Sequence, residues 1–455
     1  MDRAALLSLD TEALIGLVLQ FQQRVAALEA ELAKLRQPPK TPENSSVPPS
    51  QARKPNLSDG RKRKPGARRG HLGSSRRRAA PDLVIRCYPA QCQACGAGLP
   101  RTGQRRIGRS QVVELPPVEP KVLEAWRYAA ECQQCGARTV AAAPEGFAPE
   151  QVFGPRVSAV AGYLHEAHHL SYQRLVAVLL SLFGLRISAG AIAGVLQRLA
   201  ARAKPAAEAI KEQVRASPVI NSDETGARVN GSTWWHWVFQ TPEASYHLLA
   251  PSRGAAVIDD FLDGAVPEVW GSDCAPGQLG TPADDHQICM SHQLRDLTYA
   301  DQADGALGAQ WARQLRHVFG RAVRLHHERA AVTPETFTRR RTLIERAAER
   351  LIFGPPLGRG EAGKLQRRYQ REWESLFVFL HRDDVEPTNN SSERDLRNSV
   401  IHRKVTGGYR SDWGAEAGGI FTTILQTARK RGEDGFATLL GLSGTSPLTY
   451  ADTAS

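Results

Sequence analysis

Three acidic residues occupy positions where a bare carboxylate is costly. Asp223 follows the apolar run that starts at Val219, and Asp273 ends a second short apolar run. A charge at the end of a buried strand is unfavourable unless it is paired or binds a metal ion. Glu393 lies later, at the start of a predicted helix. Carboxylates are ligands that Mg²⁺ or Mn²⁺ prefers, and two such ions promote in-line displacement at phosphorus. Because the chain has 47 acids, position and not composition selects these three.

Four of the seven cysteines form two CxxC pairs, and each pair is followed by glycine. Glycine suits the tight turn of a zinc knuckle, and four thiolates are a typical structural Zn²⁺ site. The gap between the pairs is longer than usual. Two disulfides are the alternative, but a chain with so few cysteines and no signal-peptide pattern is expected to be cytoplasmic and reduced. Cys87 lies outside the pattern; the predicted zinc ligands are Cys92, Cys95, Cys132 and Cys135.

The positive charge of the chain is concentrated in one stretch. The net charge is +12, and most of it comes from residues 51–80. A cationic stretch favours polyanions by counterion release. No apolar run approaches the roughly 20 residues of a membrane span, so DNA is the expected partner and a solvated tether is the alternative. The predicted DNA contacts are Arg61, Lys62, Arg63, Lys64, Arg68, Arg69, Arg76, Arg77 and Arg78, together with Arg403 and Lys404 downstream.

Apolar residues at alternating spacings of four and three predict a coiled-coil helix over residues 1–36. β-Branched residues at one core position and mostly leucine at the other favour a parallel two-stranded coil. We therefore expect a homodimer through residues 14–35. A single amphipathic helix packed on the chain's own core is the alternative. The seam consists of Leu14, Val18, Phe21, Val25, Leu28, Leu32 and Leu35.

The segments that follow the coil differ in composition. Residues 37–82 are rich in Pro, Ser, Gly, Lys and Arg and predict a disordered basic linker. Residues 83–150 hold the CxxC pairs and β-rich stretches at 111–114 and 121–128, which predicts a zinc-binding DNA-recognition module. Residues 151–215 predict helices with a turn at Gly184 and an N-cap at Ser188. A helix-turn-helix and an ordinary helical hairpin are both open for this last segment.

From residue 216 the hydrophobic period changes from 3.6 to 2, which indicates a β-rich domain up to residue 445, before a tail at 446–455. The elements follow the order β-β-β-α-β-α-β-α, which is that of a ribonuclease-H-like fold. In that architecture carboxylates sit on the first strand, after the fourth strand and on a later helix. We therefore expect a multidomain α/β protein. The strands are predicted near residues 219–223, 233–240, 245–250, 266–272 and 286–290, with helices at 253–263 and from about 291.

The chain resembles the IS66 family of insertion-sequence transposases. The most specific matching stretch is Asn389-Asn390-x-x-Glu393-Arg394-x-Leu396-Arg397. The likeness covers nearly the whole chain, including the coiled-coil leader and the double-CxxC module. Cys274 departs from the family, which usually has glycine there. The other matching stretches are Ser222-Asp223-Glu224-Thr225, Gly271-Ser272-Asp273, Cys289-Met290-Ser291-His292-Gln293-Leu294-Arg295, Arg403-Lys404, Gly407-Gly408 and Asn44-Ser45-Ser46-x-Pro48-Pro49-Ser50.

The resemblance implies a DDE core with the catalytic triad Asp223, Asp273 and Glu393 and a helical insertion at about residues 305–380. Asp223 would bridge two Mg²⁺ (or Mn²⁺) ions, and the other two acids would hold one each. Such an enzyme cleaves the terminal inverted repeats of its mobile element and transfers 3′-OH strands to target DNA. The family analogy adds small accessory transposition proteins. A non-catalytic zinc-dependent DNA-binding regulator, a decayed transposase and a nuclease without strand transfer are the alternatives.

Four further side chains are expected to support the triad: His292, Arg295, Arg394 and Arg397. His292 and Arg295 would orient a carboxylate or touch the scissile phosphate, unless His292 only completes a strand-to-helix junction. Arg397 follows Glu393 by four residues, so a helical salt bridge and a phosphate contact are both open. Glu224 is expected on the opposite face of the strand from Asp223, in a structural or supporting role.

Overall fold

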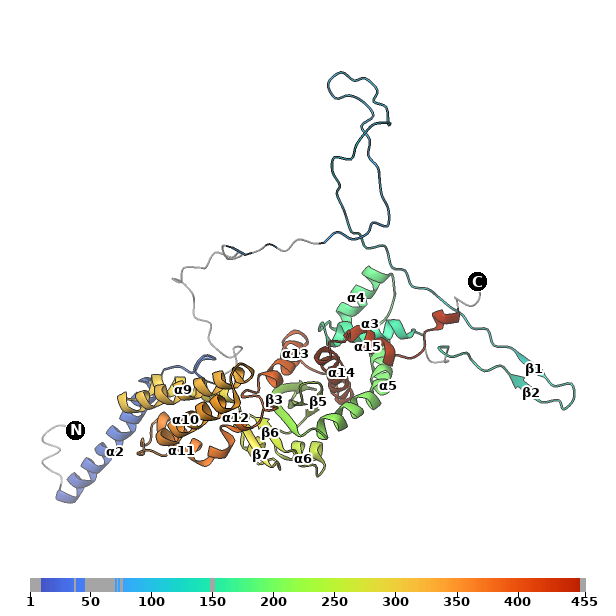
Figure 1. Ribbon diagram of the computed structural model, residues 1–455. Helices are drawn as coiled ribbons and strands as arrows, with labels where there is room; N and C mark the ends of the chain where they lie inside the picture. The colour runs from blue at the N-terminus through green and yellow to red at the C-terminus, as the bar shows by residue number, and fades with distance from the viewer. Residues whose placement is uncertain are drawn as a thin grey trace.

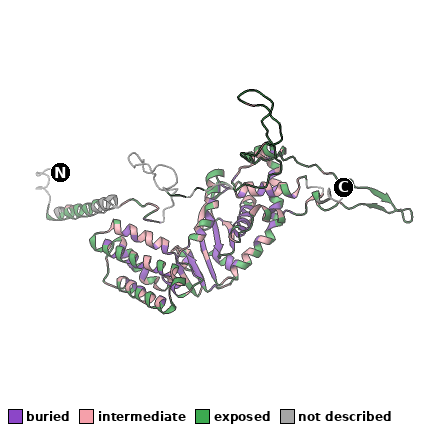
Figure 2. Ribbon diagram, turned by 45° about the horizontal axis from the view of Figure 1, so that its top comes forward, coloured by how far each residue is buried: buried purple, intermediate pink, exposed green. Residues whose placement is uncertain are grey.

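The computed structural model describes residues 10–36, 38–45, 70–71, 73, 77–147 and 152–450. These ranges contain fourteen α-helices, one five-stranded sheet and one two-stranded sheet. The larger sheet lies at the centre of the folded part, with helices on both faces and a helical group beyond β7 (Figure 1). Figure 2 shows its strands as mostly buried. The described chain is therefore a mixed α/β protein, as the sequence predicted.

The central sheet has the strand order β5-β4-β3-β6-β7. The first three strands pair antiparallel, whereas β6 runs parallel to β3 and β7 runs parallel to β6. Asn230 and Gly231 both have positive φ and form the two-residue turn of the β3–β4 hairpin. The strands are β3 (Val219–Val229), β4 (Ser232–Gln240), β5 (Ser245–Ala250), β6 (Val269–Ser272) and β7 (Asp285–Ile288).

The element order expected from the sequence is the one observed. Helix α6 (Ala256–Leu262) follows β5, the short helix α7 (Pro276–Leu279) lies between β6 and β7, and α8 (Met290–Ala303) follows β7. Most observed ends differ from the predicted ones by a few residues. The first strand is a larger correction: β3 continues six residues beyond Asp223, so this acid lies within a strand and not at its end. Backbone pairing with β4, and not hydrophobic alternation, decides where β3 stops.

Alternation along β4 gives the central sheet two different faces. Trp237 and Phe239 lie on an apolar face, where Phe239 stacks on Phe261 of α6 with ring centroids 3.9 Å apart. His236 lies on the opposite face and is fully buried there. This polar face is covered by two helices, α13 (Asn390–Thr406) and α14 (Asp412–Lys430).

A buried hydrogen-bond network holds α13 and α14 on the polar face. Ser245 Oγ lies 2.9 Å from His247 Nε2 and donates to Asp395 Oδ2, also at 2.9 Å. Asp395, on α13, pairs with Arg429 Nη2 at 2.7 Å and with Lys430 Nζ at 3.1 Å, both on α14. A buried carboxylate needs such partners, so the network fixes the orientation of α13 on the sheet.

The helical segment before the sheet contains a turn and a cap that the sequence predicted. Gly184 ends its helix with φ 63°, and Ser188 Oγ accepts a hydrogen bond from the Ala191 N–H at 3.1 Å. The third helix continues through Pro205 without a break. The helices are α3 (Pro155–Glu166), α4 (Tyr172–Phe183) and α5 (Ala189–Arg215).

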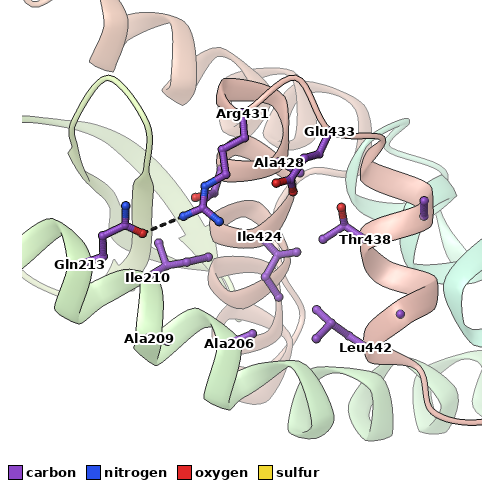
Figure 3. Close-up of a pocket in the computed structure, with 13 residues that line it drawn as sticks. Ala206, Ala209, Ile210, Gln213, Ile424, Ala428, Arg431, Glu433, Thr438 and Leu442 are labelled. Carbon is purple, nitrogen blue, oxygen red and sulfur yellow. Dashed lines mark hydrogen bonds between the residues drawn. The ribbon is translucent and has the colours of Figure 1, made fainter.

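This helical segment shares one hydrophobic core with the C-terminal helices. Leu196 and Leu199 of α5 pack with Phe421 and Ile424 of α14 and with Leu439 of α15 (Gly435–Leu442). The segment expected as a separate unit at residues 151–215 is thus structurally joined to the end of the chain. A groove of about 450 Å³ lies between α5, α14 and α15, where Arg431 donates to Gln213 at 2.7 Å (Figure 3).

A helical group lies between β7 and α13, where the insertion was predicted. Its core includes Trp311, Phe319 and Tyr369. Asp304 accepts hydrogen bonds from the first N–H groups of α11, those of Glu361 at 2.9 Å and Ala362 at 2.6 Å. The helices are α9 (Ala306–His327), α10 (Pro334–Ile352), α11 (Glu361–Arg371) and α12 (Val378–His381), with short 3₁₀ turns at Arg329–Ala331 and Trp373–Ser375.

The N-terminal helix α2 spans Thr11–Arg36, and several of its described apolar residues are exposed, Phe21 to 61% and Val25 to 50%. The structure corrects the linker prediction just after α2. Residues 38–45 form a turn in which Asn44 and Ser45 are buried, because hydrogen bonds to the chain supply the stability that apolar side chains do not. The basic residues Arg61, Lys62, Arg63, Lys64, Arg68, Arg69 and Arg76 lie outside the described residues.

Residues 77–147 extend away from the central sheet (Figure 1). Their regular structure is one exposed hairpin, β1 (Ala129–Glu131) with β2 (Arg138–Val140). The stretches at 111–114 and 121–128, expected to be β-rich, form no strand, although Val112, Val122 and Trp126 have strand-forming side chains. These side chains are exposed, so no partner strand or core supports a sheet there.

A further 3₁₀ turn lies at Pro447–Tyr450. Among the described residues, none of the helices combines the length and the apolar character that crossing a membrane would require.

Buried neutral histidines should make the stability of this fold depend on pH. Burial, assisted by the charge of Lys430, lowers the pKa of His247 to about 3, and burial beside His165 lowers that of His402 to about 3. As the pH falls below about 6.5, the unfolded chain binds protons that the folded chain refuses, so the free energy of unfolding decreases toward pH 4. Each histidine contributes roughly 2 kcal/mol of this loss at pH 5.

Denaturant unfolding near pH 7.5 and near pH 5 measures the effect. We expect His247→Gln to reduce the difference in unfolding free energy between the two conditions. The exposed His327 provides a control, since His327→Gln should keep the wild-type difference. The same pH dependence in all three proteins would contradict the role of the buried histidines.

Candidate active site

Asp223 and Asp273 lie near each other on one face of the central sheet, Asp223 within β3 and Asp273 directly after β6. Asn221 on β3 is paired with Gly271 on β6 in parallel register. Each acid lies two residues beyond this pair, so alternation places both side chains on the same face. Neighbouring strands are about 4.8 Å apart. The parallel register therefore brings together two carboxylates that are far apart in the sequence.

Gly271 leaves room for a side chain of the neighbouring strand. A Cβ atom on Gly271 would overlap with the Asn221 side-chain amide, which lies across its Cα. A larger residue at position 271 would therefore require the Asn221 side chain to move away. Gly271 belongs to one of the matching stretches, but no separate role was predicted for it.

Glu393 enters the site from the first turn of α13, which several contacts anchor to the sheet. The Asn389 side chain donates from Nδ2 to the Ser222 carbonyl oxygen at 2.7 Å. The Asn389 backbone N–H donates to Cys289 Sγ at 3.2 Å, and Ser392 Oγ donates to Asn389 Oδ1 at 2.6 Å. Asn389 therefore fixes the start of α13 against the strand that carries Asp223.

The three carboxylates interact electrostatically. Burial, followed by the charges of Glu224, Asp273 and Glu393, raises the pKa of Asp223 well above its usual range, although the Glu224 N–H donates to Asp223 Oδ1 at 2.8 Å. Like charges held together in this way are stabilised by a cation between them. The hard oxygen donors suit Mg²⁺ or Mn²⁺. Within the described residues, however, no three His, Cys, Asp or Glu side chains are already arranged to hold a metal ion.

Glu393 is instead engaged by two basic residues of α8. Arg295 Nη2 donates to Glu393 Oε1 at 3.3 Å, and His292 Nε2 lies 3.7 Å from the same oxygen. Burial, and next the charge of Arg295, lowers the pKa of His292. Both residues were predicted to orient a carboxylate or to touch phosphate, and the structure brings them to Glu393. No further role for them follows from these contacts.

Glu224 is buried and paired with neighbouring side chains, which fits the structural or supporting role expected for it. Its side chain is 1% exposed and pairs with Arg253 Nε at 2.6 Å. Gln278 of α7 donates to Glu224 Oε2 at 2.8 Å and accepts a hydrogen bond from the indole of Trp270 at 3.0 Å. These contacts hold the loop that follows Asp273 against β3 and β6. Nothing in the sequence pointed to Gln278.

The remaining predicted residues of α13 divide into two groups. Arg394, Arg397 and Lys404 are exposed, and no ion pair is found for them within the described chain. The helical salt bridge considered for Arg397 and Glu393 is not formed, because Glu393 pairs with α8. Arg403 donates to the Gly226 carbonyl oxygen of β3, so one of its N–H groups holds the helix on the sheet.

The two CxxC pairs adopt the same turn at different places. The Gly96 N–H donates to the Cys92 carbonyl at 2.9 Å, and the Gly136 N–H donates to that of Cys132 at 2.8 Å. The Cys95 N–H lowers the pKa of the Cys92 thiol, and the Gln134 N–H lowers that of Cys132. All seven cysteines have free thiols, and the two pairs do not form one cluster in the described chain.

Two of the predicted DNA-contacting arginines before the CxxC pairs lie within the described residues. Arg78 donates to the Arg109 carbonyl at 3.4 Å, while Arg77 is exposed.

Asp223→Asn should stabilise the metal-free protein near neutral pH. The amide keeps the shape of the carboxyl group and removes the buried charge that its neighbours repel. A gain of about 1 kcal/mol raises the Tm of a chain of this size by roughly 1–2 °C. Thermal unfolding in chelator measures the change, with the exposed Asp260→Asn as the control. Mg²⁺ should then raise the Tm of the wild type more than that of Asp223→Asn. A variant that is less stable than wild type in chelator would contradict this electrostatic account.

Comparison with known proteins assigns the chain to a family. The sequence model described as "Transposase IS66 family" matches residues 150–417, which is more than half of the chain and includes all three acids. An uncharacterized protein, y4jO of Sinorhizobium fredii, is 35% identical over 81 residues, or 18% of this chain. The chain spans only 25% of that relative's length. The family match confirms the resemblance noted from the sequence motifs, and the chain belongs to the IS66 family of transposases.

Proposed function

We propose that this transposase cleaves the ends of its mobile element and transfers the resulting 3′-OH strands to target DNA, using Asp223, Asp273 and Glu393 as its catalytic triad. One observation carries the proposal. Asp223 lies on β3, Asp273 directly follows the parallel neighbour β6, and Glu393 begins an anchored helix. Burial, and next the charges of Glu224, Asp273 and Glu393, raise the pKa of Asp223. A protein that only bound DNA would have no need to keep this repulsion.

The strand order supports a ribonuclease-H-like core for this reaction. Three antiparallel strands are followed by two parallel ones, in the order β5-β4-β3-β6-β7. The first acid lies on the first strand, the second after the fourth strand, and the third on a helix that follows a helical insertion. This arrangement matches the one expected for the fold in all three positions.

Asp223, Asp273 and Glu393 would hold two Mg²⁺ or Mn²⁺ ions. When bound, such ions lower the pKa of a coordinated water and stabilise charge on the attacking and leaving oxygens. The protein's own residues supply position. Asn389 fixes the start of α13, the Glu224–Gln278 pair fixes the loop after Asp273, and His292 and Arg295 hold Glu393. Arg295 would also contact the phosphate whose bond is cut.

The exposed face of α13 is a suitable track for the DNA backbone. Residues 390, 394, 397, 401 and 404 share one face of the helix, and Arg394, Arg397 and Lys404 supply its positive charge. The face extends about 21 Å from the start of the helix. It begins beside Glu393, so DNA that follows it leads into the triad.

The N-terminal segments would recognise and pair the element ends. The basic stretch around Arg77 and Arg78 provides phosphate contacts. A Zn²⁺ ion held by Cys92, Cys95, Cys132 and Cys135 would join the two turns into one module. In each turn, main-chain N–H groups lower the pKa of the first thiol, which favours metal binding. The exposed apolar residues of α2 would form a parallel coil with a second copy of the chain.

Replacing any member of the triad should abolish the chemistry and spare DNA binding. With labelled element-end DNA and Mg²⁺, we expect Asp223→Asn, Asp273→Asn and Glu393→Gln each to lose about 100-fold or more in nicking and joining. Exposed acids provide matched controls, Asp260→Asn and Glu374→Gln, which should react as wild type. Joining by the triple variant at the wild-type rate would refute the assignment. Stable folding with no activity in the wild type itself would favour the non-catalytic regulator.

Removing a cation from the exposed face of α13 should weaken DNA binding in a salt-dependent way. For Arg397→Ala, we expect the slope of log K against log salt to fall by about one, since one phosphate contact is lost. Arg340 is exposed but already paired with Glu328, so Arg340→Ala is the matched control. Binding titrations between low and moderate salt give both slopes. Equal slopes for wild type and Arg397→Ala would exclude this face as a DNA track.

A further inference from the structure

The turn at residues 38–45 is more tightly built than a linker requires. Asn44 is 4% exposed, and both the oxygen and the nitrogen of its side-chain amide form hydrogen bonds. Oδ1 accepts a hydrogen bond from the Thr41 N–H at 2.6 Å, and Nδ2 donates to the Pro39 carbonyl at 3.2 Å. Ser45 Oγ donates to the Thr41 carbonyl at 2.6 Å. An amide that both donates and accepts is needed here, so aspartate or alanine would leave buried groups unpaired.

The turn is held against helix α8. Asn44 Nδ2 also donates to Gln302 Oε1 at 2.7 Å, across more than half of the chain length. Lys40 Nζ lies 5.1 Å from the centre of the Tyr299 ring, which is itself buried. Gln302 and Tyr299 occupy the last turns of α8. The contact is therefore a specific docking of a polar turn, and not the apolar packing of α2.

The opposite end of α8 belongs to the candidate active site. His292 and Arg295 contact Glu393 there. Tyr299 and Gln302 follow these two residues by seven positions each, which is two helical turns or about 10.5 Å along the same side. One helix thus touches Glu393 at its start and the N-terminal turn near its end.

The turn also lies directly after the helix proposed to pair two chains. Helix α2 ends at Arg36, and the docked segment starts at Pro38. Pro38, Pro39 and Pro42 restrict the backbone of this short connection. Because one residue separates α2 from the docked turn, docking residues 38–45 on α8 keeps the end of α2 close to α8, at the same end of the molecule as α9 and α10 (Figure 1).

We propose that residues 38–45 are a docking clip that binds the Tyr299–Gln302 surface of α8, so that pairing of two α2 helices sets the positions of two catalytic centres. The partner of this surface is the chain's own N-terminal segment. The consequence for joining rests on the proposed transposase function, whereas the docking itself does not. Single-end nicking needs one centre, so it should not depend on the clip.

The docking can be tested without any activity. A specific protease site placed within residues 51–57 of the full-length protein allows the chain to be cut after the clip. We expect the cut N-terminal fragment to co-elute with the remainder on gel filtration. Asn44→Ala and Gln302→Ala should each weaken this association at least about tenfold, and the double variant should lose little more. Glu43 is exposed in the same turn, so Glu43→Ala is the matched control.

Two results would overturn the docking: dissociation of the cut wild-type protein, or unchanged association in Asn44→Ala. Circular dichroism of each variant checks that α2 and the remaining fold are intact. In the DNA assay, Asn44→Ala should nick a single end at the wild-type rate and join paired ends at least about tenfold more slowly. Wild-type joining by a variant that no longer docks would overturn the role in pairing. Absence of nicking in every protein would instead refute the catalytic proposal and leave the docking result standing.

Discussion

The main constraint on this structure is that three negatively charged side chains must be held close together beside the central sheet. Asp223 and Asp273 follow paired positions on parallel strands, and Glu393 acts on Asp223 electrostatically from the first turn of α13. Carboxylates repel one another when water is excluded, so the fold must hold them by other contacts. Gly271 leaves room for the Asn221 side chain between β3 and β6. Asn389 fastens α13 to the Ser222 carbonyl. These contacts hold the acids in place despite their repulsion, and the proposed metal ions would neutralise it.

A second buried carboxylate, that of Asp395, helps to hold α13 on the sheet. Asp395 lies two residues after Glu393 and therefore faces the other side of α13. It is almost fully buried, but Ser245, Arg429 and Lys430 satisfy it. One side of α13 is thus held to the sheet and α14 by Asp395, while Glu393 on the other side pairs with residues of α8. The first contact provides rigidity, and the second carboxylate is the one proposed for catalysis. The groove between α5 and α14, by contrast, is lined mostly by small and apolar residues and contains none of the three acids.

Much of the core could be predicted from the sequence because its signals are local. Alternating apolar residues located β4 and β5, and the cap at Ser188 was correctly placed. Parallel pairing and long-range hydrogen bonds leave no local signal, so Gln278, Asn389 and Asp395 were assigned no role. The turn at residues 38–45 was predicted to be disordered because its composition is polar. Its order comes instead from Asn44, whose partner Gln302 is remote in sequence. The strands expected at 111–114 and 121–128 are not formed for the opposite reason. Their side chains suit a strand, but no neighbouring strand or core packs against them in the described chain.

The most direct measurement of the central claim is the location of bound Mn²⁺. Anomalous diffraction from crystals of the protein with element-end DNA and Mn²⁺ would place the ions without reference to activity. The account predicts two peaks about 3.5–4 Å apart, with Asp223 between them and with Asp273 and Glu393 on either side. Ions bound elsewhere, or a triad that remains empty while Glu393 stays paired with Arg295, would contradict it.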